Sequence, residues 1–599
     1  MMMRFSIIIF AVCIASCLSP VFAGESEGFD QNFLLIYDSW HENSLKTAEN
    51  IRKTFKFSLL SFEEFDVRSN ITEMKLRSVF PSALILALED ISLVQSCVDS
   101  YLAGGGTVVA AMGIADAELL NKWGLSDGSS SQVSCTTAKG LVSCEQVYQN
   151  YSALLSEAVL LSRCIILKPS SSWKVILKAK TPVDFPILLH RSNREEEITY
   201  RAADRMNGNI ILWNSDCIVQ KRFRGLFLFS LFSSLKHPAA LPTMNSMSIS
   251  FEDSPPPTYA FSLIKDNGLS LDCEKYYEKD WYPKIIGVLR EMAIKTTHAV
   301  CVHYSNCTQP PFSANNSRSL FLEKILNILL LNGHEVAFHG YNHHSLTVYP
   351  ASYTPWPTLP WLSKSDMVES LQCAKSEWNR LNLRHPTVYF PPNNLIDKSG
   401  IAALSKVFPT IRAICANYYQ PQSIQNLDEF SIDESGKFLS MPRISEGATA
   451  TETQLFDILN GIMCHGIINH CYFPFEHEKS DPFEIKNHIY LLKKLMPVAR
   501  NLPLNRLAIE LSQFFRNNYQ ITGTITKKSN FLAIKSKYPR TNYFFLFPNI
   551  GSGRNGPGSI ESQKSIKIEN GKIIAEVLKN TVYLIESASD TTSITLCTE

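Results

Sequence analysis

Residues 247–257, MSISFEDSPPP, decide the fold, because they form an apolar strand that ends in two acidic residues and three prolines. Three later stretches repeat this design of an apolar strand followed by histidine, proline or asparagine: 334–344 (HEVAFHGYNHH), 386–394 (PTVYFPPNN) and 466–476 (GIINHCYFPFE). Helical stretches separate them, such as Lys364 to Leu381. The repeated order of strand, polar cluster and helix predicts a β/α barrel over residues 245–504, with an active site where the strands end.

The block before the barrel, residues 24–240, has a related pattern. Apolar runs such as FLLIYD from Phe33 and ALILAL from Ala83 alternate with helical stretches, which is typical of an α/β domain. The order of elements resembles flavodoxin-like and amidotransferase-like domains. The glycines at 104–106 precede a strand, which indicates a turn after a helix rather than a phosphate loop. Met112 and Gly113 stand where an amidotransferase nucleophile would be sought, so we expect this domain to be non-catalytic.

The last block, residues 505–599, changes to short alternating strands such as TGTITK and FLAIKS, joined by glycine and asparagine turns. This spacing predicts a small all-β sandwich domain. Such a domain could bind carbohydrate or only cap the barrel, and the sequence leaves both roles open.

Composition and the first residues bear on partners and compartment. The chain has 599 residues, and its 57 Lys+Arg nearly balance its 56 Asp+Glu, so no net charge favours nucleic acid. Arg4 and the apolar run from Ile7 to Ile14 predict a signal peptide over residues 1–23, and therefore a secreted or periplasmic protein. The residues up to Cys17 also resemble a lipobox, which would leave a lipid anchor at Cys17. We expect no transmembrane segment after signal removal, and the sequence gives no oligomeric state.

The remaining cysteines are spread along the chain without a CxxC pair, which argues against a zinc ribbon. Cys301 and Cys307 are close enough to close one loop with a disulfide in an oxidising compartment. Buried free thiols are the alternative for these cysteines.

Histidines and carboxylates at two strand ends predict a metal site. His339 and His343 stand four residues apart, a spacing at which a loop or helical turn can point both imidazoles at one ion. The pair alone could equally belong to a histidine-rich surface turn. Asp253 at another strand end completes a His, His, Asp set that leaves a coordination position open for water. Glu252 is then the expected base, and His470 the expected acid that protonates a departing amine.

These residues carry a resemblance to a known family. Ser250-Phe251-Glu252-Asp253, His339 to His343, Phe390-Pro391-Pro392-Asn393 and Ile467 to His470 match, in order, the motifs of polysaccharide deacetylases of the NodB-homology type. That family has a deformed β/α barrel and removes N- or O-acetyl groups with a divalent metal. The resemblance implies that Asp253, His339 and His343 hold the metal, with Zn²⁺ as the expected ion.

The sequence departs from the family pattern at three places. Glu252 stands where the family has an aspartate base, and Phe390 replaces the arginine that would orient that base. The family's remaining acidic motif has no clear counterpart, and Arg443 is the candidate that would supply the missing positive charge. The chain therefore resembles a divergent branch that includes exopolysaccharide and galactosaminogalactan deacetylases.

The loop 349–361 and the third motif give candidate substrate contacts. Tyr349, Trp356 and Trp361 lie in a proline-stiffened loop that could stack on a sugar ring or fold onto its own aromatics. Asn393 is assigned to the substrate as well. Together these features predict a metal-dependent deacetylase acting on an N-acetylated amino-sugar polysaccharide. Two alternatives stay open: an inactive carbohydrate-binding protein on the same barrel, and a glycoside hydrolase, which needs two carboxylates about 5 to 9.5 Å apart.

Overall fold

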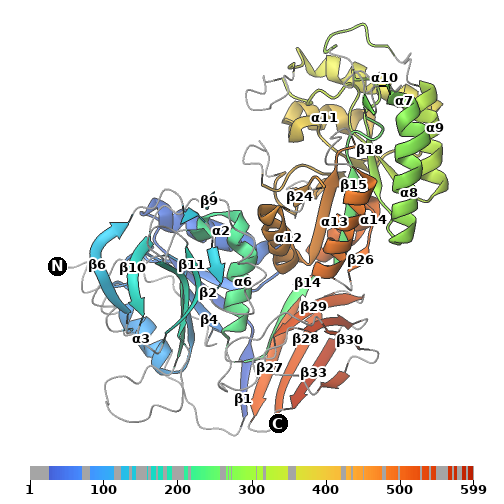
Figure 1. Cartoon of the computed structure of the whole chain (residues 1–599). Helices are drawn as coiled ribbons and strands as arrows, with labels where there is room; N and C mark the ends of the chain where they lie inside the picture. Colours follow the sequence, from blue (N-terminus) through green and yellow to red (C-terminus); the bar gives the residue numbers. More distant parts are fainter. Residues whose placement is uncertain are drawn as a thin grey trace. The chain divides into compact units, whose positions relative to one another are not determined.

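The chain forms two compact units in the computed structural model (Figure 1). Unit 1 consists of Met1–Met244, Thr451–Gly466 and Asn517–Glu599, and unit 2 of Asn245–Ala450 and Ile467–Arg516. The structure describes residues between 26 and 597 except for several short breaks and the segments 70–80, 113–122, 144–157, 192–207, 257–264, 349–358, 420–426, 475–480, 548–563 and 576–582. The expected signal segment, with Cys17, lies outside the described residues. None of the described helices is long and apolar enough to cross a bilayer.

Unit 1 contains an eight-stranded sheet whose first five strands are parallel. The strand order is β3 (Phe62–Asp66), β2 (Phe33–Tyr37), β4 (Ala83–Ala87), β5 (Thr107–Ala110), β13 (Asn209–Trp213), β12 (Phe185–Arg191), β11 (Trp173–Ala179) and β8 (Leu141–Ser143). Its helices are α2 (Glu42–Phe57), α3 (Gln95–Ala103) and α6 (Arg224–Ser233). Every residue of β4 is buried, as expected for a parallel strand covered on both faces. The α/β pattern expected before the barrel is confirmed in this sheet.

Two further sheets of unit 1 each pair one earlier strand, β1 or β14, with strands from the C-terminal part of the chain. One contains β1 (Ser26–Asp30), β27 (Tyr519–Thr526), β28 (Ser529–Ser536), β33 (Thr591–Cys597) and β31 (Lys572–Ala575). The other contains β14 (Ala239–Thr243), β29 (Asn542–Phe547), β32 (Tyr583–Ser587) and β30 (Lys564–Ile568). Two-stranded sheets are formed by β6 (Leu125–Val133) with β10 (Cys164–Pro169) and by β7 (Ala138–Lys139) with β9 (Ala158–Val159). In unit 2, β16 (Lys265–Asp266) pairs with β17 (Leu269–Ser270) in the same way.

One helix from the middle of the sequence also belongs to unit 1. Helix α12 (Glu452–His465) begins with a capping box formed by Thr451 and Gln454, and it ends at Gly466, whose φ of +63° suits the left-handed conformation. Its ring of Phe456 packs on Phe223, with ring centroids 5.5 Å apart. The barrel segment expected as one block is therefore interrupted, because α12 packs on α6 and belongs to unit 1.

Unit 2 is built on a curled, mostly parallel half-barrel sheet, which confirms the β/α architecture of this block. From strand β15 (Ser246–Phe251), one arm runs through β18 (Thr297–Val300), β19 (Glu335–Phe338), β20 (Val388–Tyr389), β21 (Ala413–Ile414), β23 (Leu439–Ser440) and β22 (Ser431–Ile432). The other arm contains β25 (Ile467–Tyr472) and β24 (Ser445–Glu446), and β26 (Arg500–Asn501) also pairs with β15. Among these pairs, β22 with β23 is antiparallel and the others are parallel.

The helices of unit 2 are α7 (Cys273–Tyr276), α8 (Tyr282–Glu291), α9 (Ser319–Leu331), α10 (Lys364–Arg380), α11 (Lys398–Val407), α13 (Pro482–Leu495) and α14 (Leu504–Phe515). Local chemistry explains where two of them begin: Ser363 caps α10 by accepting from the backbone N–H of Asp366, and Asp397 caps α11 by accepting from that of Gly400. The boundary between the barrel and the all-β domain was expected after residue 504, but α14 begins at Leu504 and unit 2 continues to Arg516. Cys301 and Cys307 form no disulfide with each other.

The segment between β23 and β24 ties the two arms of the half-barrel together. The backbone N–H of Arg443 donates to the carbonyl of Ala416 at 2.7 Å, and that of Ile444 donates to the carbonyl of Asn469 at 2.9 Å. Ala416 follows β21 in one arm, whereas Asn469 belongs to β25 in the other. Because this segment crosses the carboxyl edge of the sheet, it can direct a side chain toward the residues that follow β15.

Candidate metal centre

Two neighbouring carboxylates at the end of β15 face the same group. Consecutive residues of an extended strand normally point to opposite faces. Asp253 breaks this rule, because its φ of +52° lies in the left-handed region and turns the chain. As a result Glu252 Oε1 and Asp253 Oδ1 both lie 3.4 Å from Nε2 of His339. Both carboxylates are buried.

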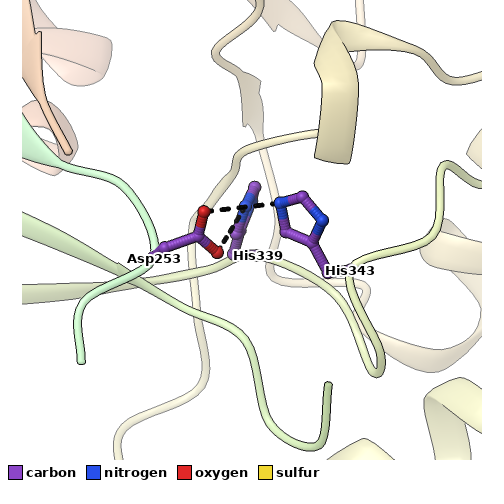
Figure 2. A group of neighbouring side chains, drawn as sticks. All are labelled: Asp253, His339 and His343. Atoms are coloured by element: carbon purple, nitrogen blue, oxygen red, sulfur yellow. Dashed lines mark ion pairs between the residues drawn. The ribbon is translucent and has the colours of Figure 1, made fainter. Parts of the chain in front are cut away.

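The two histidines come from the loop after β19 rather than from a helix. Gly340 has a φ of +99° and His343 a φ of +60°, so the loop folds back on itself between the two imidazoles. Their ring centroids are 5.0 Å apart, and Nε2 of His343 lies 3.4 Å from Asp253 Oδ2. Figure 2 shows the three side chains directed toward one another. Asp253, His339 and His343 thus converge as the sequence predicts.

The distances fit a bound divalent ion. A tetrahedral ion with bonds of about 2.0 to 2.2 Å holds its ligand atoms about 3.3 to 3.6 Å apart. His339 Nδ1 donates to the carbonyl of Phe390 at 2.9 Å, which leaves the lone pair on Nε2. That Nε2 is buried and has no hydrogen bond of normal geometry in the described part of the chain. A buried unpaired nitrogen aimed at two carboxylates is the arrangement that a cation would complete.

The electrostatics of the cluster follow from its geometry. Burial alone would raise the pKa of Asp253, but His343 and His339 outweigh it and hold that pKa well below the usual range. Burial would lower the pKa of His343, but the charge of Asp253 outweighs it and raises that pKa. The side chain of His343 is 29% exposed, whereas that of His339 is fully buried. The cluster is therefore reached from solvent on the His343 side.

Tyr304 is a site residue that sequence reasoning missed. Its hydroxyl donates to Asp253 Oδ1 at 2.6 Å, and its ring stacks on that of His343 with centroids 5.9 Å apart. Tyr304 thus contacts two of the three candidate ligands. The signal was present in THAVCVHYSN, residues 297–306, because β18 is another apolar strand followed by polar and aromatic residues.

Strained backbone gathers at this cluster. Asp253, Tyr304 and His343 all have φ between +51° and +60°, a region that costs a residue with a side chain about 1 to 3 kcal/mol. Such conformations persist where the surrounding contacts enforce them, and they are concentrated at functional sites. Here the three strained residues have side chains that contact one another at the candidate metal centre.

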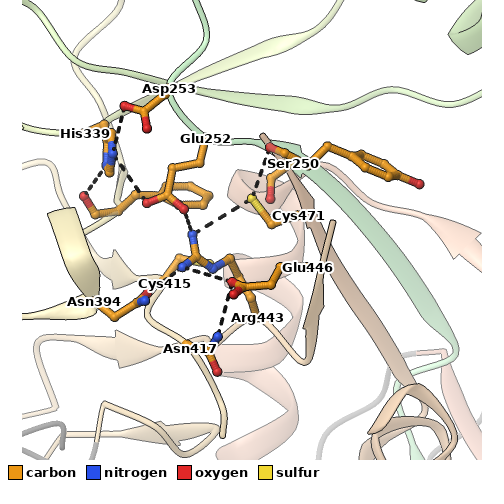
Figure 3. Close-up of polar contacts among 12 residues, drawn as sticks. Ser250, Glu252, Asp253, His339, Asn394, Cys415, Asn417, Arg443, Glu446 and Cys471 are labelled. Atoms are coloured by element: carbon orange, nitrogen blue, oxygen red, sulfur yellow. Dashed lines mark hydrogen bonds and ion pairs between the residues drawn. The ribbon is translucent and has the colours of Figure 1, made fainter. Parts of the chain in front are cut away.

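Glu252 is held from its other side by Arg443. Nη1 of Arg443 forms an ion pair with Glu252 Oε2, and Nη2 donates to Oδ1 of Asn394 (Figure 3). Arg443 Nη2 also lies 3.7 Å from Oε2 of Glu446, which accepts from the amide of Asn417. Arg443 is 1% exposed. A positive charge thus contacts Glu252 from Arg443, whereas residue 390 is a phenylalanine.

Phe390 has a different role from the arginine that it replaces. The guanidinium of Arg443 lies 5.8 Å from the ring centroid of Phe390 and 5.9 Å from that of Phe473. The phenylalanine thus covers an arginine that comes from the segment between β23 and β24, and its backbone carbonyl orients His339. The third motif keeps its position in the site but contributes packing and a carbonyl in place of a charge.

His470 lies on the wrong face of β25 for the expected acid. Its neighbours Asn469 and Cys471 contact the interior, where Asn469 donates to the carbonyl of Pro442 and Cys471 Sγ lies 3.9 Å from Arg443 Nη1. Alternation sends His470 to the other side, where its ring lies 4.6 Å from that of His488 on α13. Burial, and then His488, lower the pKa of His470 well below its usual value. It is a neutral core histidine, not placed beside Glu252.

The candidate substrate contacts are placed differently from one another. Trp361 is 1% exposed and donates its Nε1–H to the carbonyl of Ser345, so it packs in the core and presents no face to a sugar. Tyr349 and Trp356 lie outside the described residues. Asn393 is half-buried in a left-handed turn beside Asn394, and its amide nitrogen has no hydrogen bond to the described residues. Asn393 therefore keeps a free donor next to the residue that holds Arg443.

Comparison with solved structures gives partial matches only. They include a candidate polysaccharide deacetylase from Mycobacterium smegmatis, with 13% identity and a TM-score of 0.30 over 45% of this chain and 90% of that chain. A peptidoglycan N-acetylglucosamine deacetylase matches with 14% identity and a TM-score of 0.24 over 43% and 86% of the two chains. A CE4 family pseudoenzyme from Bacillus anthracis matches with 11% identity and a TM-score of 0.22 over 42% and 62%. Similarity at this level does not bear on activity.

Comparison of the sequence itself is more decisive. No curated protein matches the chain. One family model matches residues 23–579, which include both units and every residue of the candidate metal centre. The chain belongs to the family described as "Uncharacterised protein conserved in bacteria (DUF2194)".

Proposed function

We propose that unit 2 is a metal-dependent hydrolase that removes N-acetyl groups from an amino-sugar polysaccharide. The observation that carries this proposal is the convergence of Asp253, His339 and His343, with a separate carboxylate, Glu252, 3.4 Å from the unpaired nitrogen of His339. Ligands for an ion and a base beside it are the two parts that metal-assisted hydrolysis requires. The order of the motifs along the chain supports acetylated sugar as the substrate class.

The residues divide the chemistry between them. A divalent ion at this site supplies Lewis-acid chemistry, which polarises the acetyl carbonyl and makes a water molecule more acidic. Glu252 accepts the proton of that water as its oxygen attacks the carbonyl carbon. Arg443 holds Oε2 of Glu252, so that Oε1 is left to face His339.

The proton must return when the carbon–nitrogen bond breaks. His470 lies on the opposite face of β25, so it is not positioned to deliver that proton. We assign this step to Glu252 as well, since it has just gained a proton and adjoins the ligand cluster. The products are then acetate and a sugar with a free amine. Export by the expected signal segment would place the enzyme where such polymers occur.

The two alternatives fit the geometry less well. A glycoside hydrolase needs one carboxylic acid with a raised pKa and a second carboxylate across the bond. Here Glu252 and Asp253 approach the same imidazole nitrogen, and the pKa of Asp253 is lowered. An inactive sugar-binding protein is favoured by the position of His470, but it gives no reason for an unpaired ligand nitrogen beside two carboxylates.

Acetate release tests the proposal. Full-length protein would be incubated with N-acetylated oligosaccharides of several sugars, and free acetate and new amines would be measured. We expect equal amounts of both products, loss of release with a chelator, and recovery on addition of Zn²⁺. Intact glycans with metal-loaded protein would favour the binding protein, and shortened glycans would favour the glycoside hydrolase.

A further inference from the structure

Unit 1 has its own collection of polar residues at the carboxyl edge of its parallel sheet. Strand β2 lies between β3 and β4. The chain leads from β2 to β3 on one side and from β4 to β5 on the other, so the direction of the connections reverses here. In open α/β sheets, ligands bind in the crevice outside the strand ends at such a switch point. Residues 38–41 follow β2 at this place, and residues 67–69 follow β3 beside it.

A saturated ion pair makes this edge rigid. Asp38 is buried and accepts from Nε and Nη2 of Arg68 at 2.8 and 2.6 Å. It also accepts from the backbone N–H of Trp40 at 2.9 Å and from Nδ1 of His41 at 2.8 Å. Burial would raise the pKa of Asp38, but the bonds to Arg68 dominate and lower it to about 2. Asp38 thus fixes the side chains of Arg68 and His41 and the backbone of Trp40, and it has no capacity left for a ligand.

The residue that this pair holds is an exposed tryptophan. Trp40 is 70% exposed, and the guanidinium of Arg68 lies 4.6 Å from the centroid of its ring. An indole left in water forgoes the free energy of burying its apolar face, which a ligand that covers the ring recovers. Because Arg68 already orders the ring, a ligand that stacks on it has little side-chain entropy to remove.

Polar groups with unused capacity adjoin the ring. His41 bonds Asp38 through Nδ1, which leaves Nε2 available, and the ring is exposed. Asp66 Oδ1 accepts from the backbone N–H groups of Ser39 and Arg68, whereas its Oδ2 has no partner among the described residues. Asp66 and Asp90 both act on the charge of Arg68, so the surroundings are unfavourable to anions such as phosphate. A neutral or cationic ligand with a flat apolar face and hydroxyl groups fits this chemistry.

We propose that the Trp40 patch, defined as Trp40, His41, Asp66 and Arg68, binds a pyranose ring of the amino-sugar polymer and retains the polymer on the protein. The indole stacks on the apolar face of the ring, and His41 and Asp66 bond its hydroxyl groups. The identity of the polymer rests on the function proposed for unit 2. The patch is a binding site without turnover, because its buried carboxylate is committed to Arg68.

The test measures binding rather than activity. Metal-loaded, full-length Glu252→Gln, chosen to prevent turnover, would be titrated with N-acetylated, fully deacetylated and glucose-based oligosaccharides by calorimetry. Adding Trp40→Ala should weaken amino-sugar binding at least about tenfold. His41→Ala should weaken it less, because one hydrogen bond is lost while the stacking surface remains. Phe483→Ala is the matched control, since Phe483 is 65% exposed on α13 in unit 2 and should leave binding unchanged.

The outcomes separate this inference from the proposed function. Unchanged binding in Trp40→Ala, or no binding of any glycan by the parent, would overturn the patch even if wild-type protein releases acetate. Binding that depends on Trp40, together with no acetate release by wild type, would overturn the function of unit 2 and leave the patch standing. Equal weakening by Phe483→Ala would also count against the patch, because exposed aromatics in general would then explain the effect.

Discussion

The carboxyl edges of the two parallel sheets hold polar clusters of opposite character. In unit 2, Asp253 and His339 face each other with an imidazole nitrogen that has no hydrogen bond of normal geometry. In unit 1, Asp38 has both oxygens paired, and the group left open is the ring of Trp40. Topology therefore selects the place of a site, whereas unpaired donor atoms decide what it binds. An ion suits the first edge and a stacked ring the second.

The largest effect expected from this comparison is on metal binding. His339→Ala removes the buried nitrogen that adjoins both carboxylates, so the affinity for Zn²⁺ should fall at least about a thousandfold, beyond the tenfold to hundredfold cost of losing a supporting contact. Asp38→Asn is the control at the other edge and should leave the affinity unchanged. Competition with a chelating dye measures both. Equal Zn²⁺ affinity of His339→Ala and wild type would contradict the claim that the carboxyl edge of the unit 2 sheet binds the ion.

The buried ion pair of unit 2 should dominate stability. Arg443→Ala leaves Glu252 buried without its partner, which should reduce the free energy of unfolding by about 3 to 5 kcal/mol. Arg52→Ala in unit 1 removes a solvent-exposed pair with Glu64 and should cost about 1 kcal/mol or less. Denaturant unfolding of the two variants measures the difference. Similar losses would mean that Arg443 does not act as a buried partner of Glu252.

Acid should weaken both units through buried neutral histidines, and His488 in unit 2 and His237 in unit 1 are two of these. Burial lowers the pKa of His488 in unit 2 to about 4, and mainly burial lowers that of His237 in unit 1 to about 4. The unfolded chain takes up these protons below about pH 6.5, so stability present above that pH is lost as pH falls toward 4, by roughly 3 kcal/mol per histidine. Amide hydrogen exchange measured by unit should show that His488→Gln reduces the pH dependence of unit 2 alone. A change confined to unit 1 would refute this assignment.

The smallest expected effect concerns Tyr304. Tyr304→Phe keeps the ring that stacks on His343 but removes the hydroxyl bonded to Asp253, so Zn²⁺ affinity should fall about tenfold to a hundredfold. Tyr101→Phe removes a buried tyrosine hydroxyl bond in unit 1 and should leave affinity unchanged. The absorption spectrum of the Co²⁺-loaded protein gives a second measurement, since it changes when a ligand moves. An unaltered spectrum and affinity in Tyr304→Phe would show that the hydroxyl is only structural.

Much of the metal centre was predictable because parallel strands end at one edge. That rule brings Asp253 toward His339 across 86 residues without knowledge of any contact. The sequence could not show that Glu252 and Asp253 face one point, because this depends on the left-handed backbone of Asp253. Arg443 was identifiable as a candidate only because the expected position, Phe390, lacked a charge.

His470 shows where sequence reasoning reaches its limit. The strand residues 467–472 are buried throughout, so no alternation of polar and apolar residues indicates which of them face the interior. A shift of one residue exchanges the two faces, and the structure assigns the interior to Asn469 and Cys471. The pairing of β1 and β14 with C-terminal strands was likewise unpredictable, since a short strand carries no signature of a distant partner.

The most direct test of the central claim is acetate release by Glu252→Gln compared with wild type at equal metal content. The amide keeps the size of the side chain but cannot accept the proton of water, so release from an N-acetylated oligosaccharide should fall about 10²- to 10⁴-fold. Bound Zn²⁺ should remain, because Asp253, His339 and His343 are intact. Unchanged release by Glu252→Gln would contradict the assignment of Glu252 as the base.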